Sequence, residues 1–486
     1  MLDLPVADIA AATAATIVCG DTDKQVTAVE TDSRRVAAGT LFVCFPGERV
    51  DGNDFAASAV KAGAAAIALT REPSCELVSA AQRNSCALLR VADDDPTEFM
   101  LRLAEAWRLR NPQWAVIGVT GSVGKTTTKD LLAAGLGACW KTHATAGNFN
   151  NLIGLPLTLL SADPSDEVVI CEMGMNHKGE LSRLTKAARP SVALITNVGT
   201  SHIGLLGSRE NIARAKAEII EGLQLSAVPQ QLSIGEVHSC LVMTSDNDFA
   251  PFIEKEFCRP AAVETSYVGE GEKTSLSCGS IALDELGRPE FDVSFSDGTM
   301  RHSKLELPGA AVVSDYLLAL AIAERLGAKR DMVCSAMEHM PASHMRLEVV
   351  GGGEQPRLID DSYNASPTSM AAALDVLASL PCTGRRIAVL GEMGEMGDES
   401  ARLHEYVGCY AAAKKPDLIV WVGTKDAALM REAALVMGFS DDHMESFADA
   451  ASALATIKPI LNAKDLVLVK ASRSAGLDAF VKGVLA

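Results

Sequence analysis

The chain has 486 residues, which is too many for one hydrophobic core and predicts two to four domains at about 100–200 residues each. A hydrophobic fraction of 48% with 22% charged residues excludes a disordered or collagen-like chain. With 44 Lys and Arg against 62 Asp and Glu, the net charge of −18 argues against general nucleic-acid binding. A local site could still bind a phosphorylated small molecule, because net charge reports mainly on solubility.

The 12 cysteines are spread singly, with no C-x-x-C pair, which indicates reduced thiols and neither a disulfide framework nor a zinc site. The first residues lack the basic segment of a signal peptide, and no run of about 20 apolar residues occurs. We therefore expect a cytoplasmic protein without membrane insertion.

Residues 1–92 are predicted to form a small α/β domain. The apolar runs 41–45 and 64–69 indicate strands, and a helix is expected over 55–62 between them. The acidic stretch 93–95 predicts a linker and a helix start, in which Asp95 caps the helix and Pro96 occupies its first turn.

Residues 93–342 are predicted to form a central domain around a parallel sheet. Buried-strand patterns occur at 115–119, 168–171 and 192–195, with helical stretches between them, which favours helices on both faces. Residues 230–300 alternate polar and apolar positions and predict added antiparallel strands, before a closing helix near 313–326.

Residues 343–486 resume the alternation of strands and helices. Strands are expected at 387–390, 418–422 and 466–469, which predicts a C-terminal doubly wound, Rossmann-like domain. The predicted fold class is thus α/β with three domains.

A glycine-rich loop lies between the first central strand and the next helix. Residues 118–128 read Gly-Val-Thr-Gly-Ser-Val-Gly-Lys-Thr-Thr-Thr, and such a loop lets backbone N–H groups and a helix N-terminus approach phosphates. Lys125 would bridge the β- and γ-phosphates, and Thr126 would help to hold Mg²⁺. The first glycine is one place early for the strict phosphate-loop motif, so an ordinary βα turn is the alternative. The nucleotide cradle is assigned to Thr120, Gly121, Ser122, Val123, Gly124, Lys125, Thr126 and Thr127.

Two further polar residues follow strands of the same predicted sheet. Glu172 ends the strand at 168–171, and His202 follows the strand at 192–195. Ligands of parallel sheets collect beyond the carboxyl ends of the strands, so both side chains could converge on a nucleotide-bound metal. Taken singly, Glu172 could cap a turn and His202 could be a surface residue.

These motifs together resemble the Mur ligases over nearly the whole chain and in the family's order. The matching segments are 31–34, 120–129, 147–151, 172–176, 196–202, 360–365, 390–397 and 472–474. Glu-Met-Gly-Met at 172–175 and Asp-Ser-Tyr-Asn-Ala at 361–365 favour the members that use D-alanyl-D-alanine.

The resemblance implies an N-terminal domain that binds the UDP-sugar, a central ATPase domain and a C-terminal domain that binds the incoming dipeptide. The implied reaction is ATP-dependent addition of D-alanyl-D-alanine to UDP-N-acetylmuramoyl-tripeptide through an acyl phosphate. It belongs to peptidoglycan precursor synthesis, and so to cell-wall building, cell shape and division. The implied partners are these small molecules, ATP and Mg²⁺. We expect the protein to be a monomer. A sister Mur ligase, a folylpolyglutamate synthase and a catalytically impaired nucleotide-binding relative remain alternatives.

The resemblance also assigns roles to individual residues. Lys216 would match the family's carbamylated lysine, which CO₂ converts into a carboxylate-like Mg²⁺ ligand; by itself it could equally be a solvated lysine. The implied catalytic residues are Lys125, Lys216, His202 and Glu172, and the implied metal ligands are Thr126, Glu172, His202 and Lys216. The third domain would contribute Arg346, Asp361 and Asn364 to the nucleotide. The implied substrate contacts are Ser33, Arg34, Asn148, Asn151 and Arg473.

The chain departs from the family near the expected adenine site. Where members carry H-N-x-x-N after L-P-G, this chain has Ala311 and Val312 in place of the His-Asn pair and Asp315 in place of the later Asn. A segment that usually reads N-A-D begins here with Thr244. Either the ATP pocket is rebuilt locally or activity is reduced.

Overall fold

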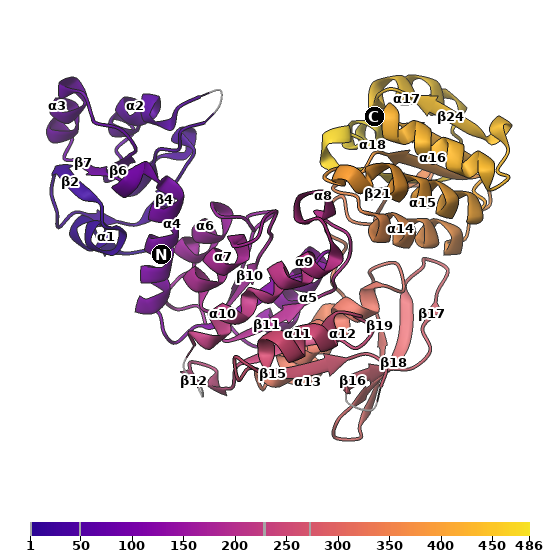
Figure 1. Ribbon diagram of the computed structural model, residues 1–486, viewed down its shortest axis with the longest axis horizontal. Helices are drawn as coiled ribbons and strands as arrows, with labels where there is room; N and C mark the ends of the chain where they lie inside the picture. Colours follow the sequence, from indigo (N-terminus) through magenta and orange to yellow (C-terminus); the bar gives the residue numbers. More distant parts are fainter. Residues whose placement is uncertain (1, 48–49, 227–229, 272–273) are drawn as a thin grey trace.

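The computed structural model describes residues 2–47, 50–226, 230–271 and 274–486. Figure 1 shows three lobes, one for each large sheet, with the central lobe between the other two. Each sheet lies within one of the three predicted domain ranges, while the boundary residues stay a prediction. In the described part of the chain, no helix has the length and apolar character needed to cross a membrane.

The N-terminal lobe has a five-stranded sheet in the order β2-β7-β6-β5-β4. Its strands are β2 (Thr16–Cys19), β4 (Ala28–Glu30), β5 (Thr40–Val43), β6 (Ala66–Leu69) and β7 (Ala87–Arg90), with helices α1 (Val6–Thr13), α2 (Ala56–Lys61) and α3 (Cys75–Arg83). The lobe leads into α4 (Pro96–Arg110), whose start is the predicted one, because the Asp95 carboxylate accepts from the amides of Thr97 and Glu98. The buried side chains of α4 pack in the same core as the first central helices and so join the two lobes.

The central lobe has a ten-stranded sheet in the order β17-β18-β16-β15-β14-β11-β8-β10-β9, with β19 beside β18. The strands are β8 (Ala115–Thr120), β9 (Thr142–Ala144), β10 (Val168–Glu172), β11 (Val192–Ile195), β14 (Cys240–Thr244), β15 (Glu264–Val268), β16 (Thr274–Cys278), β17 (Ala282–Leu283), β18 (Pro289–Phe295) and β19 (Met300–Lys304). The prediction of antiparallel strands over 230–300 is right for β17 to β19, and β16 pairs antiparallel with β18 but parallel with β15. It is wrong for β14 and β15, which run parallel to β11 because a helical crossover joins them.

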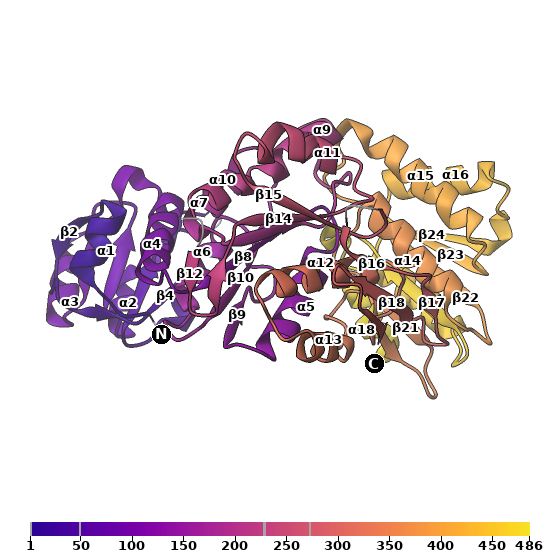
Figure 2. The ribbon, with the colours of Figure 1, turned by 90° about the horizontal axis from the view of Figure 1, so that it is seen from below.

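Helices cover both faces of this sheet, as predicted (Figure 2). Along β8, Ile117 and Val119 belong to one core cluster and Val116 to the other, as the alternation of a strand requires. One face carries α5 (Lys125–Gly137), α12 (Val312–Arg325) and α13 (Arg330–Glu338). The other carries α6 (Gly154–Ser161), α7 (Glu180–Ala188), α9 (Arg209–Ala217) and α10 (Ile219–Gln224).

The C-terminal lobe has a six-stranded sheet in the order β20-β21-β25-β22-β23-β24, parallel except for β20. Its strands are β20 (Glu348–Gly351), β21 (Arg357–Asp361), β22 (Arg386–Gly391), β23 (Leu418–Val422), β24 (Met444–Phe447) and β25 (Leu466–Lys470). Its helices are α14 (Pro367–Ser379), α15 (Ser400–Ala413), α16 (Lys425–Val436), α17 (Ala450–Ile457) and α18 (Asp478–Leu485).

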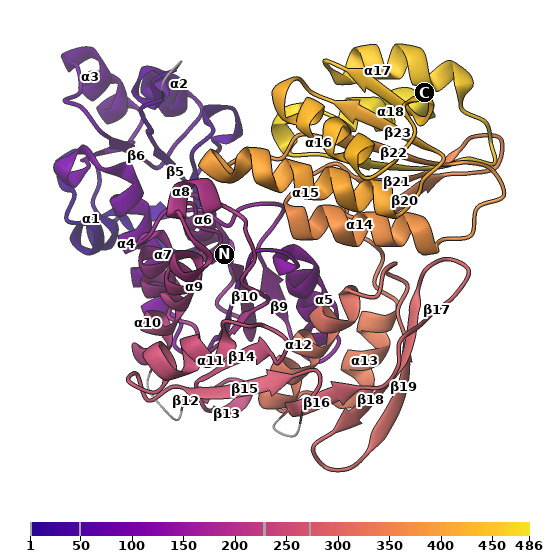
Figure 3. The ribbon, with the colours of Figure 1, turned by 45° about the vertical axis from the view of Figure 1, so that its right-hand side comes forward.

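The central and C-terminal lobes touch beside the short helix α8 (Ile203–Leu206), as Figure 3 shows. The amide of Gly204 donates to the carbonyl of Glu395 at 3.1 Å. A Cβ atom on Gly204 would collide with the backbone of Gly397, so the two chains meet at a distance that only glycine allows. This contact holds the carboxyl ends of the two sheets against one another.

Candidate functional site

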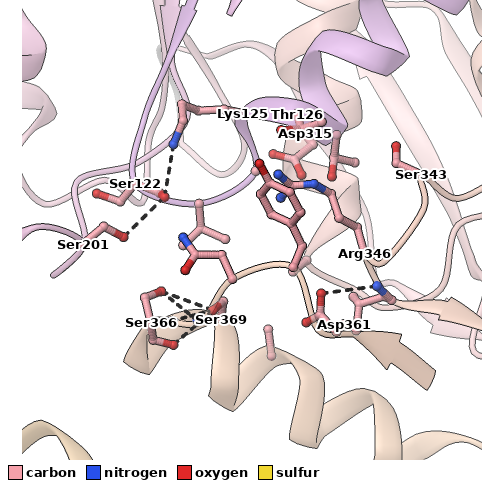
Figure 4. Close-up of a pocket in the computed structure, with 18 of the residues that line it drawn as sticks. Ser122, Lys125, Thr126, Ser201, Asp315, Ser343, Arg346, Asp361, Ser366 and Ser369 are labelled. Carbon is pink, nitrogen blue, oxygen red and sulfur yellow. Dashed lines mark hydrogen bonds between the residues drawn. The ribbon is translucent and has the colours of Figure 1, made fainter. Parts of the chain in front are cut away.

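A cavity of about 550 Å³ opens between the carboxyl ends of the central strands and the C-terminal lobe. Its central wall includes the glycine-rich loop, Glu172 and His202. Its other wall includes Arg346 and Asp361, which are labelled in Figure 4 together with Lys125 and Thr126 of the loop. Residues that are far apart in the sequence therefore line one cleft, which is the usual form of a small-molecule site.

The loop has the geometry of a phosphate cradle. Gly124, with φ of +86°, begins α5, which has no side-chain cap on its first turn. Asn197 holds the loop from behind, because its side chain accepts from the amide of Val123 at 3.1 Å and donates to the carbonyl of the same residue at 3.1 Å. Uncapped N–H groups at a helix N-terminus attract anions. Asn197 was noticed in the sequence only as part of a motif.

Lys125 lies over this loop and donates to the carbonyl of Gly121 at 2.8 Å. Burial lowers the pKa of Lys125, the carboxylate of Glu172 opposes that shift, and the guanidinium of Arg346 adds to it. Lys125 is partly exposed and lines the cavity. Its ammonium therefore lies at the loop itself, within the proposed phosphate cradle.

Oxygen and amide groups gather around Glu172 at the end of β10. The hydroxyl of Thr126 donates to Oε2 of Glu172 at 2.9 Å, and the side chain of Asn150 donates to Oε1 at 2.7 Å. Mg²⁺ in phosphate sites is usually held by one or two carboxylates together with phosphate oxygens, so Thr126 and Glu172 fit such an ion. No cluster of three or more His, Cys, Asp or Glu side chains suited to a metal occurs within the described residues. Asn150 was not among the predicted site residues.

His202 lines the cavity in a left-handed conformation, with φ of +62°. Its Nδ1 lies 2.5 Å from Oε2 of Glu395 in the C-terminal lobe, and this contact lowers the pKa of Glu395. The sequence placed His202 at a strand end but offered no sign of an acidic neighbour from another domain.

Lys216 lies on α9 and is only 2% exposed. In the part of the chain that the structure describes, its ammonium has no hydrogen-bond or ion-pair partner. Burial drives the pKa of Lys216 well below its usual range, and the positive charge of Lys125 adds to this shift. The surroundings of Lys216 therefore favour a neutral amine, unlike those of a solvated surface lysine.

The C-terminal lobe contributes a second polar cluster. The carboxylate of Asp361 accepts from Nζ of Lys470 at 2.5 Å and from the amide of Leu347 at 3.3 Å. Burial raises the pKa of Asp361, while Lys470 and Arg346 oppose that shift. The guanidinium of Arg346 lies 4.4 Å from the centre of the Tyr363 ring. Lys470 was missed by the sequence analysis, although it ends strand β25 and so obeys the same rule that located Glu172.

The predicted substrate residues do not all meet in this cavity. Asn148, Asn151 and Asn364 line it. Ser33 and Arg34 lie on the 3₁₀ helix η1 (Ser33–Arg35) of the N-terminal lobe, outside the cavity lining. The side chain of Arg34 is 86% exposed there and pairs with Asp32 at 2.6 Å.

Arg473 also lies outside the cavity lining, with Nη1 3.7 Å from the sulfur of Met345. Of the residues that depart from the family, Ala311, Val312 and Asp315 line the cavity, whereas Thr244 is buried in β14.

A three-lobed α/β chain whose phosphate loop faces a second domain across a cavity is typical of ligases that use a nucleoside triphosphate. Comparison with known families agrees with this class. The Mur ligase middle domain matches residues 119–323, the Mur ligase glutamate ligase domain matches 345–473, and the Mur ligase family catalytic domain matches 25–108. The chain belongs to the Mur ligase family and is an ATP-dependent ligase.

Individual relatives cover almost the whole chain. A UDP-N-acetylmuramoyl-tripeptide–D-alanyl-D-alanine ligase of Bacillus subtilis is 34% identical over 94% of this chain and 93% of its own length. A crystal structure of MurF from Acinetobacter baumannii superposes with a TM-score of 0.86 at 28% identity, covering 99% of both chains. MurF of Thermotoga maritima, solved in complex with ADP, gives a TM-score of 0.77 at 25% identity over 94% of this chain and 97% of its own.

Proposed function

We propose that this protein joins D-alanyl-D-alanine to UDP-N-acetylmuramoyl-tripeptide, the two substrates that the name of the Bacillus subtilis relative gives for that enzyme, and that the reaction converts ATP to ADP and phosphate. The observation that carries the proposal is the shared cavity, in which Lys125 and Glu172 of the central lobe face Arg346 and Asp361 of the C-terminal lobe. The proposed setting is the cytoplasm, in keeping with 12 free cysteines, and the proposed form is a monomer.

The chemistry needs a better acyl donor than a carboxylate, whose oxygens leave poorly. In the proposed mechanism the tripeptide carboxylate attacks the terminal phosphorus of ATP, ADP departs, and an acyl phosphate forms. The neutral amine of the dipeptide then attacks the acyl carbon, phosphate leaves, and the amine loses a proton.

The side chains assigned from the sequence each have a part in this scheme. Lys125 and the uncapped amides of α5 would hold the transferred phosphoryl group, and Arg346 would balance its charge from the other lobe. Thr126, Glu172 and His202 would hold Mg²⁺, which supplies charge neutralisation at the phosphates when bound. The remaining substrate contacts are assigned to Ser33, Arg34, Asn148, Asn151 and Arg473. Asp361 and Asn364 would position the nucleotide, and closure of the two lobes would exclude water from the acyl phosphate.

Lys216 has its own proposed role as a carbamate. A neutral amine attacks CO₂, an N–C bond forms and a proton is released, so a cationic side chain becomes an anion. The burial of Lys216 and its closeness to the charge of Lys125 support this role, because both favour the neutral amine that the step requires.

The direct experiment is a phosphate-release assay with UDP-N-acetylmuramoyl-tripeptide, in which D-alanyl-D-alanine is added or omitted. We expect turnover only when both are present. A second candidate, a nucleotide-binding relative without catalysis, is favoured by the loss of polar groups at Ala311 and Val312. Tight ATP binding without phosphate release under any of these conditions would select that candidate.

For the carbamate, we expect Lys216→Ala to abolish turnover with little change in the melting temperature. The exposed Lys186, which pairs with Glu221 on the surface, is the matched control, and Lys186→Ala should keep its activity. NMR spectra of protein equilibrated with ¹³C-bicarbonate should show a carbamate signal that is absent from Lys216→Ala. Normal turnover in Lys216→Ala would contradict the carbamate role of Lys216.

A further inference from the structure

His404 is a buried histidine that the mechanism above does not use. It lies in the second turn of α15, in the C-terminal lobe, and its side chain is 0% exposed. α15 follows the loop of residues 392–397, which leaves β22 and ends at the start of the 3₁₀ helix η5 (Gly397–Glu399). We call residues 392–397 the lobe-contact loop, because they carry the contact with α8 of the central lobe.

Both ring nitrogens of His404 have a hydrogen-bond partner whose role is fixed. The backbone amide of Met393 donates to Nε2 at 2.8 Å, and an amide N–H can only donate. Nδ1 lies 2.8 Å from the carbonyl oxygen of Ser400, which can only accept. The ring therefore carries its proton on Nδ1 and keeps a lone pair on Nε2. The two bonds together require a neutral imidazole, because a cationic ring has no lone pair for the amide of Met393.

The surroundings of the ring agree with this tautomer. Oδ2 of Asp426, on α16, lies 3.9 Å from Nδ1, the nitrogen that carries the proton, and accepts from the hydroxyl of Ser400 at 2.8 Å. Met393 is only 4% exposed, and in the described part of the chain Nε2 of His404 is the only acceptor of its amide. Without the imidazole this buried donor would be unpaired, which would favour a different course of the loop.

The lobe-contact loop joins the two lobes. Its first residue, Glu392, is bound to the C-terminal lobe, where its carboxylate accepts from amides at the start of α16. Further along, the carbonyl of Glu395 accepts from the amide of Gly204, and its Oε2 lies 2.5 Å from Nδ1 of His202. Glu395 has a φ of +63°, a left-handed conformation that persists in a residue other than glycine only where neighbouring contacts hold it. The bond to His404 lies between these two ends, two residues before Glu395.

We propose that His404 is a positioning residue that holds the lobe-contact loop in the shape needed to meet the central lobe. As a neutral imidazole it accepts from the amide of Met393 and so fixes the backbone from which Glu395 reaches the other lobe. This role concerns the joint between the lobes and needs no bound nucleotide. Its consequence for turnover rests on the proposed function, because the cavity has both of its walls in place only while the lobes touch.

Two variants separate the acceptor from the rest of the side chain. His404→Gln keeps an acceptor oxygen near the position of Nε2, whereas His404→Leu has an apolar side chain without an acceptor. Hydrogen–deuterium exchange of the unliganded protein, followed by mass spectrometry, should be about tenfold faster in His404→Leu, both in the loop at 392–397 and across the joint at 203–206. His404→Gln should stay close to the unmodified protein in both segments. The control His443→Leu changes an exposed histidine of the same lobe and should alter neither segment.

Two results would overturn the inference. Faster exchange that is confined to 392–397 in His404→Leu would show that His404 serves its own lobe alone. Equal exchange in His404→Gln and His404→Leu would show that the acceptor for Met393 does not matter. If His404→Leu does not fold, His404→Asn takes its place with the same expected result, because its shorter amide stays near Ser400 and does not reach Met393.

Turnover separates this inference from the proposed function. In the phosphate-release assay, kcat of His404→Leu should fall by up to the factor by which exchange across the joint rises, because the closed arrangement is less populated. His404→Gln should keep most of its kcat. If the unmodified protein releases no phosphate while exchange follows the expected pattern, the role of His404 stands and the proposed ligase function fails.

Discussion

Two helices of this molecule each begin with a lysine after a parallel strand, but they differ in what their first-turn amides bind. α5 starts with Lys125 after the strand β8, directly after Gly124, and α16 starts with Lys425 after the strand β23, two residues after Gly423; both glycines have a positive φ. At α5 no side chain caps the first turn, and the cavity lies in front of it. At α16 the Oε1 atom of Glu392 accepts from the amides of Thr424, Asp426 and Ala427 at 2.8–3.1 Å.

The comparison shows that a Rossmann-like sheet does not by itself create a nucleotide site. Both helix N-termini carry the same partial positive charge, which stabilises a nearby anion. In the C-terminal lobe the protein supplies that anion from its own side chain, and a Cβ on Gly423 would collide with it. Of these two helix N-termini, only that of α5 has first-turn amides that no side chain caps.

The largest effect is expected on turnover, when the lysine that begins each of the two helices is replaced. Lys125→Ala should lower kcat by about 10²–10³-fold or more, because a buried cation at the phosphates is lost. Lys425→Ala, the same change at the matching position of α16, should leave turnover unchanged. Steady-state phosphate release measures both variants, and equal losses in the two would contradict the assignment of α5 as the phosphate site.

An intermediate effect is expected at Glu392. Glu392→Ala removes the acceptor for three amides and should cost about 1–3 kcal/mol in the free energy of unfolding. Urea denaturation followed by circular dichroism measures this loss. We expect the variant to bind no additional ADP, because an open helix N-terminus alone does not make a nucleotide site. A second equivalent of bound ADP would show that the carboxylate alone had blocked a nucleotide site.

The smallest effect concerns the support behind Glu392. The hydroxyl of Ser472 donates to the carbonyl of Glu392 at 2.7 Å and holds the backbone of this loop. Ser472→Ala should cost about 1 kcal/mol in the same denaturation experiment, with the loop still closed by the amide of Ser472, which donates to the same carbonyl. A loss larger than that of Glu392→Ala would mean that the loop depends on the hydroxyl more than on the cap.

Much of the central site could be predicted from the sequence because its signals are local. The phosphate loop is a contiguous motif, and Glu172 follows from one rule about the ends of parallel strands. The same rule would have found Lys470 had it been applied to β25. Asn150 and Asn197 belong to recognised segments, but their bonds to Glu172 and Val123 depend on how the loops fold back.

The pattern of apolar residues and glycines in the chain was enough to determine three α/β domains, the phosphate loop and the family, since hydrophobic periodicity and short motifs act over a few neighbouring residues. Only the tertiary structure decided that His202 meets Glu395, that Glu392 fills the N-terminus of α16, and that His404 accepts from the amide of Met393. Each of these contacts joins segments from different elements, and its energy depends on distances of about 3 Å that packing alone sets.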